Sequence, residues 1–136
     1  LSIDIPQTDD QFLIGNFHSY DPWQFAGECV SQWGTDTDKH NLKAIYQKAY
    51  DWSLVNNIPV MINEFAAAKY DFTKPENVCD QSQREAYIAT HVDYADEFGF
   101  AATYWDDAGS FSTYDRGNNT WGPEKDILVS KQVPAQ

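Results

Sequence analysis

Basic side chains are scarce in this chain: nine Lys and Arg stand against 21 Asp and Glu, which gives a formal net charge of −12. A surface this acidic repels the phosphates of nucleic acids and of anionic membranes, so we expect neither as a partner. No apolar run approaches the roughly 18 residues needed to span a bilayer. A neutral polysaccharide is insensitive to this charge, although solubility alone accounts for the acidity equally well.

Cysteine is scarce too, with only Cys29 and Cys79. Two cysteines are too few for a disulfide scaffold; they form one bridge in an oxidising compartment and are ordinary thiols elsewhere. The sequence has no spacing of Cys, His, Asp and Glu that is typical of a metal site, so we predict no metal and no other cofactor. No glycine-rich loop follows an apolar run, which argues against a nucleotide-binding Rossmann unit.

What the chain has is apolar and aromatic surface: 42% of its 136 residues are hydrophobic and 15% aromatic, as in a folded domain. Three short apolar runs are each followed by a helical pattern. We predict strands at 12–17, 58–62 and 100–105, and helices from Asp36–Asp38 to about 57, at 81–98 and from 122 to about 129. This alternation predicts an α/β fold of three βα units with parallel strands.

Polar residues gather just past the end of each predicted strand. His18 and Tyr20 follow the first strand, Glu64 follows the second, and Trp105 and Asp106 follow the third. In a (β/α)₈ barrel this end of the strands carries the active site. The periodicity alone does not separate a barrel from an open, doubly wound sheet.

Three motifs at these strand ends resemble a known family. They read Phe17-His18-Ser19-Tyr20-Asp21-Pro22-Trp23, then Pro59-Val60-Met61-Ile62-Asn63-Glu64-Phe65, then Tyr104-Trp105-Asp106-Asp107-Ala108-Gly109. In this order they resemble the sixth to eighth βα units of glycoside hydrolase family five, the cellulase and mannanase barrels. The resemblance implies a partial (β/α)₈ TIM barrel, with residues 1–136 as the C-terminal portion of the catalytic domain.

The resemblance further implies a retaining glycosidase that cleaves a β-linked polysaccharide such as cellulose or another β-glucan. Such enzymes use two carboxyl groups about 5 Å apart, one as the nucleophile and one as the acid/base. Glu64 is the expected nucleophile; without the neighbouring motifs it would be interpreted as an exposed loop residue. By the same resemblance the Tyr20 hydroxyl orients the nucleophile, and His18 contacts the sugar or the acid/base.

Further residues are expected at the substrate. Trp105 presents an indole face on which a pyranose ring can stack, while Asp106 and Asp107 either contact sugar hydroxyls or cap the turn. Trp23 and Trp33 either extend the cleft or cover the helix ends. Cys29 and Cys79 fall in the loops after successive strands, at the same face of the expected barrel, so a disulfide between them is plausible.

The family's acid/base lies in an Asn-Glu-Pro element that this sequence lacks; Glu28 is the best local substitute. Three βα units also cannot close an eight-stranded barrel. We therefore expect the chain to pair with a complementary N-terminal half or with itself. The alternative is a non-catalytic carbohydrate-binding or assembly fragment. A secreted location is inferred from the family alone, since no signal peptide is visible, and the exact polysaccharide stays open.

Overall fold

The computed structural model describes residue 10 and residues 12–131. A three-stranded parallel sheet lies at its centre, in the order β1 (Gly15–Ser19), β2 (Val60–Phe65) and β5 (Ala101–Tyr104). The parallel pairing predicted from the sequence is confirmed. The first strand begins three residues later than expected, and the second extends through Glu64 to Phe65.

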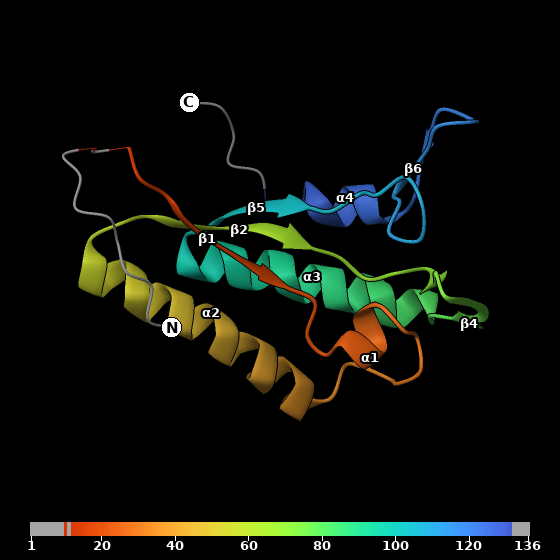
Figure 1. Cartoon of the computed structure of the whole chain (residues 1–136), viewed down its shortest axis with the longest axis horizontal. Helices are drawn as coiled ribbons and strands as arrows, with labels where there is room; N and C mark the ends of the chain where they lie inside the picture. The colour runs from red at the N-terminus through yellow and green to blue at the C-terminus, as the bar shows by residue number, and fades with distance from the viewer. Residues whose placement is uncertain (1–9, 11, 132–136) are drawn as a thin grey trace.

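Two long helices connect these strands and lie on the same side of the sheet, as Figure 1 shows. They are α2 (Asp36–Asn56), between β1 and β2, and α3 (Gln81–Phe98), between β2 and β5. The N-cap of α2 is Thr35, not one of the residues 36–38 expected from the sequence, because Thr35 and Asp38 form a reciprocal capping box. Helix α3 ends where expected, at Phe98, and Gly99 follows it with a left-handed φ of 69°.

The core fills the space between the sheet and these helices. On β1 the side chains alternate, so that Phe17 and Ser19 turn toward the helices while Asn16 and His18 are exposed on the opposite face. The central strand contributes Ile62 and Phe65 to the core, at 0% and 1% exposure. The helices supply most of the remaining buried side chains, including Leu42, Tyr46, Tyr87, Ile88, His91, Val92 and Ala95.

Short elements follow the carboxyl ends of the three strands. Helix α1 (Trp23–Ala26) follows β1, and the hairpin of β3 (Tyr70–Asp71) and β4 (Lys74–Val78) follows β2. The hairpin of β6 (Tyr114–Asp115) and β7 (Thr120–Trp121) and then α4 (Glu124–Leu128) follow β5. The sequence did not predict these hairpins, because three of their four strands are two residues long and carry no readable alternation.

Candidate active site

Glu64 lies near the end of β2, directly beside β1. The pairing of the two strands runs Phe17 to Ile62 and then His18 to Glu64, so Asn63 is skipped in an irregularity of the register. Without this irregularity, strict alternation would point Asn63 rather than Glu64 to the side of His18. The local backbone therefore brings the Glu64 carboxyl to the exposed face of the sheet, where 27% of the side chain is accessible.

Two residues on and just after β1 contact the Glu64 carboxyl. The Tyr20 hydroxyl donates to Glu64 Oε2 at 3.1 Å, and His18 Nδ1 lies 3.3 Å from the same oxygen. The structure thus brings together the three residues that the sequence analysis placed at the catalytic centre. The hydrogen bond from Tyr20 and the close approach of His18 to the same oxygen restrict the orientation of the carboxyl.

Tyr20 is a donor that does not ionise at neutral pH. Burial, together with its hydrogen bond to Glu64 and the charge of that carboxyl, raises the pKa of Tyr20 far above its ordinary value. Its ring also packs edge-on against Trp23 and Phe111, with centroid distances of 6.1 and 5.8 Å. The hydroxyl therefore stays protonated and fixed toward Glu64.

Two of the predicted sugar-binding indoles are accessible. Trp105 is 45% exposed, and its backbone N–H donates to the carbonyl of Phe65, the residue after Glu64. Trp23 is 40% exposed and packs over Gly27, where a Cβ atom would lie 2.4 Å from the indole. Only glycine leaves room for the indole in this position.

Trp33 does not extend the substrate cleft, which was one of the two roles expected for it. Its side chain is 4% exposed and packs against Phe25 and Tyr87, at centroid distances of 6.3 and 5.1 Å. It covers the start of α3, where its backbone N–H donates to the side chain of Gln83. The indole is therefore part of the core, because the loop before α2 turns it inward.

Asp106 and Asp107 cap the turn after β5, one of the two roles expected from the sequence. Asp106 accepts hydrogen bonds from the backbone N–H groups of Ala108, Thr113 and Tyr114, and Arg116 forms an ion pair with it at 3.0 Å. Asp107 likewise accepts from two N–H groups within its own turn. Although burial opposes it, this set of donors holds the pKa of Asp106 well below its ordinary value.

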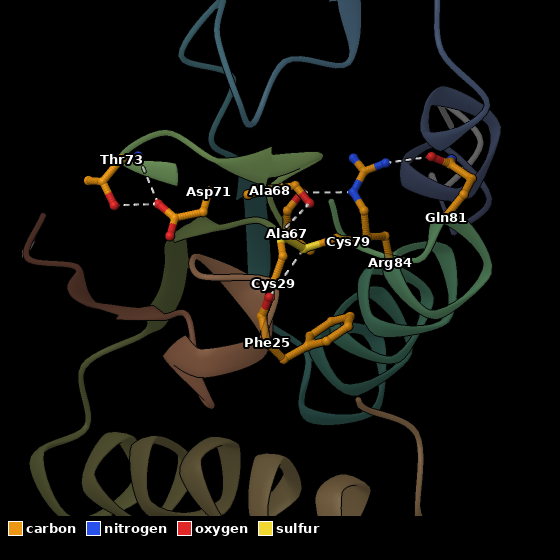
Figure 2. The surroundings of a disulfide bond; sticks show 9 residues. All are labelled: Phe25, Cys29, Ala67, Ala68, Asp71, Thr73, Cys79, Gln81 and Arg84. Carbon is orange, nitrogen blue, oxygen red and sulfur yellow. Dashed lines mark hydrogen bonds between the residues drawn. A yellow bond between two sulfur atoms is a disulfide. The ribbon is translucent and has the colours of Figure 1, made fainter. Parts of the chain in front are cut away.

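Cys29 and Cys79 form a disulfide, shown in Figure 2. The bridge joins the loop after α1 to the segment that precedes α3, across a sequence separation of 50 residues. Beside it, the Cys79 backbone N–H donates to the carbonyl of Lys69. The bridge therefore fastens the end of the hairpin that follows β2 to the loop after α1, the helix that carries Trp23.

The remaining histidines lie away from Glu64. His40 is exposed on α2, whereas His91 is fully buried on α3, so one is a surface and one a packing residue. Across residues 10 and 12–131 no group of three or more His, Cys, Asp and Glu side chains is placed to hold a metal ion. Over the same residues no helix is long and apolar enough to cross a membrane.

The fold and its structural relatives define a segment of a (β/α)₈ barrel of the glycoside hydrolase class. The family model for cellulase, glycosyl hydrolase family 5, matches residues 1–110, and the chain belongs to this family. Over 115 residues it is 36% identical to endoglucanase H of Acetivibrio thermocellus, covering 85% of this chain. It is 26% identical to endoglucanase A of Paenibacillus barcinonensis, again over 85% of the chain.

Solved structures agree with this assignment. A hyperthermophilic endo-β-1,4-glucanase in complex with substrate superimposes with a TM-score of 0.78 at 26% identity, covering 91% of this chain. Thermotoga maritima Cel5A in complex with mannotriose gives the same TM-score at 20% identity and shows the fold alone. The chain spans 12% and 32% of the two curated relatives and 41% of the endo-β-1,4-glucanase structure.

Proposed function

We propose that this chain supplies the nucleophile half of a retaining glycoside hydrolase active site that cleaves β-linked glucan, with Glu64 as the nucleophile. The observation that carries the proposal is the contact of Tyr20 and His18 with one oxygen of Glu64, at the carboxyl end of the central strand. Both contacts involve Oε2, so we assign the attack to Oε1. This carboxylate oxygen bonds to the anomeric carbon as the bond to the leaving oxygen breaks, and water later releases the sugar.

The second carboxyl group must protonate the leaving oxygen and then activate that water. The sequence contains no Asn-Glu-Pro element, where the family carries this residue. We therefore propose that this chain forms the sixth to eighth βα units and that a complementary N-terminal part of the barrel provides the acid/base. Glu28, half-buried in the loop after α1, is the only local substitute that we retain.

Cellulose-type glucan is the substrate class that the site and the relatives favour. Trp105 and Trp23 offer accessible indole faces near Glu64, and indoles stack on the apolar faces of sugar rings. Related structures are described with cellotriose and, in Thermotoga maritima Cel5A, with cellobiose. The disulfide fits an oxidising compartment, so we also propose that the protein acts outside the cell.

Hydrolysis of an aryl β-cellobioside with a dinitrophenolate leaving group tests the proposal, because this leaving group needs no proton donor. We expect the parent chain to release dinitrophenolate, alone or with an N-terminal barrel segment of endoglucanase H. Glu64→Gln should abolish release, while Glu97→Gln, which changes an exposed carboxyl on α3, should retain it. Equal rates in the parent and in Glu64→Gln would contradict the proposal.

The same assay addresses the alternative of a non-catalytic binding fragment. Such a fragment would bind cello-oligosaccharides through Trp105 and Trp23. It would release no dinitrophenolate, either alone or with the N-terminal barrel segment. Calorimetric titration with cellotetraose, in the parent and in Trp105→Ala, would reveal binding in the absence of turnover. Turnover that depends on Glu64 excludes this alternative.

A further inference from the structure

The largest fully buried side chain of the described residues is a charged one that the proposed mechanism does not use. Arg84, in the first turn of α3, is 1% exposed, and its guanidinium lies 2.9 Å from the carboxyl of Glu124, whose side chain is 4% exposed. A buried ion pair is often no more stabilising than two apolar residues of similar size. Stability alone therefore does not account for this pair, and its contacts suggest another role.

Each nitrogen of the guanidinium has a different partner. Arg84 Nε donates to the carbonyl of Ala67 at 3.2 Å, Nη1 donates to Gln81 Oε1 at 2.6 Å, and Nη2 forms the ion pair with Glu124 on α4. Figure 2 shows the first two of these contacts beside the disulfide. Lysine has a single charged nitrogen and cannot reproduce such a planar fork.

The segment Ala66–Ala68, which Arg84 contacts, follows Glu64 and Phe65 directly. All three alanines are fully buried. The Ala68 N–H donates to the carbonyl of Ala26 on α1 at 2.7 Å, and the next N–H, that of Lys69, donates to the carbonyl of Ser110 at 2.7 Å. The loops after all three sheet strands are thus joined at this one segment.

The structure around Glu124 is also shaped to fit the ion pair. A Cβ atom on Gly122 would lie 2.4 Å from Glu124 Oε2 and 3.1 Å from the carbonyl oxygen of Thr113, so a larger residue at position 122 would crowd this carboxyl. The Gln81 amide also donates to Glu124 Oε1 at 3.3 Å, which closes the network. Helix α4 is therefore connected to the segment behind Glu64 through Arg84.

We infer that Arg84, held by Glu124, is a positioning residue for the nucleophile: it fixes the Ala66–Ala68 segment so that Glu64 stays aligned with Tyr20 and His18. This inference rests on the proposed function, because it assigns Arg84 an effect on the attack by Glu64. A displacement of about 1 Å at a reacting group can lower a rate by about a hundredfold. Loss of the network should therefore lower kcat rather than weaken binding.

The test compares the parent with Arg84→Met/Glu124→Leu, which removes both charges and keeps similar side-chain volumes. Hydrolysis of dinitrophenyl β-cellobioside should show kcat lowered about tenfold or more, with KM changed by less than about twofold. Amide hydrogen exchange at Ala68 and Lys69 should be faster. The matched control, Lys43→Met/Glu97→Leu, removes an exposed ion pair between α2 and α3 and should leave kcat and this exchange unchanged.

Parental kcat and parental exchange in the double variant would overturn the inference, as would an equal loss of kcat in the control variant. If the double variant does not fold, Arg84→Lys replaces it; a selective loss of kcat supports the inference, and parental kcat overturns it. Failure of the proposed function is distinct, because the parent itself would then show no turnover that depends on Glu64.

Discussion

At the scale of single residues, the proposed chemistry depends most directly on the contact between Tyr20 and Glu64. The Tyr20 hydroxyl donates to Glu64 Oε2, and its ring is held by Trp23 and Phe111. A hydrogen bond to a charged group contributes about 1.5–3 kcal/mol. The contact can be removed without removing the ring, which allows a direct test.

Tyr20→Phe should lower kcat/KM for dinitrophenyl β-cellobioside about 10- to 100-fold, the kinetic equivalent of that hydrogen bond. The melting temperature should change little, because the aromatic contacts remain. Tyr70→Phe, on β3, serves as a control that removes a hydroxyl elsewhere. Wild-type activity in Tyr20→Phe would show that the hydroxyl does not position Glu64.

The buried side chain of His91 should make the free energy of unfolding depend on pH. It is fully buried on α3, 2.8 Å from the Tyr46 hydroxyl, and burial lowers the pKa of His91 to about 3, from an ordinary value of 6.5. Between these two pH values the unfolded state binds more protons than the folded state. The free energy of unfolding therefore falls as the pH decreases from about 6.5 toward 3, by at most about 1.4 kcal/mol per pH unit from this residue.

We expect urea unfolding to show this loss in the parent between pH 6.5 and 5, above the range in which most carboxyl groups titrate. His91→Phe should flatten the dependence on pH in this window, while its aromatic ring keeps the packing against Phe65. His40→Phe, at an exposed position of α2, provides the comparison. The same slope in the parent and in His91→Phe would contradict a buried, neutral His91.

At the scale of elements, the disulfide between Cys29 and Cys79 should be a main source of stability for the loops around the site. Closing a loop of about 50 residues restricts the unfolded chain by about 4 kcal/mol in the loop-entropy model. Replacing both cysteines by alanine should lower the free energy of unfolding by an amount of this order, measured by urea denaturation. An unchanged midpoint would show that the bridge does not constrain the chain.

The elements also show what the sequence could and could not predict. Helix α3 was predicted at 81–98 and lies at Gln81–Phe98, because Asp80 caps its start and Gly99 ends it. Strand β1 was placed too early, since the apolar run begins before the paired residues. The hairpins after β2 and β5 were missed because pairing between two-residue strands depends on the tertiary structure.

For the site, the motifs predicted which residues belong together, but not how they are held. Glu64, His18 and Tyr20 were named from the sequence, whereas their common oxygen depends on a register irregularity that no pattern reveals. The role of Arg84 was also missed. A signal was present: Arg84 shares the inward stripe of α3 with Ile88 and Val92, and a charge on such a stripe indicates a buried partner.

At the scale of the whole molecule, the sheet has one covered and one open face among the described residues. The strands β1 and β5 form its two edges, and Ile14, just before β1, is 60% exposed. Unpaired edges and exposed apolar side chains favour association. This agrees with a barrel that is completed by further strands.

Light scattering after size exclusion should therefore give a mass above 15.5 kDa for the chain alone, or a 1:1 complex when an N-terminal barrel segment is added. Ile14→Lys should weaken this association, because it places a charge beside an edge strand. Ser130→Lys, at an exposed position after α4, controls for the added charge. A strict monomer under both conditions would contradict the proposed completion of the barrel.

The central claim, that Glu64 is the nucleophile, is tested most directly by covalent trapping. A 2-deoxy-2-fluoro-cellobioside with a dinitrophenolate leaving group forms a glycosyl ester without an acid catalyst and then hydrolyses slowly. We predict that mass spectrometry of the digested protein, with the N-terminal segment present, finds one cellobiosyl label on the peptide that contains Glu64 and none in Glu64→Gln. A label on another carboxyl group, such as Glu28 or Asp107, would contradict the assignment.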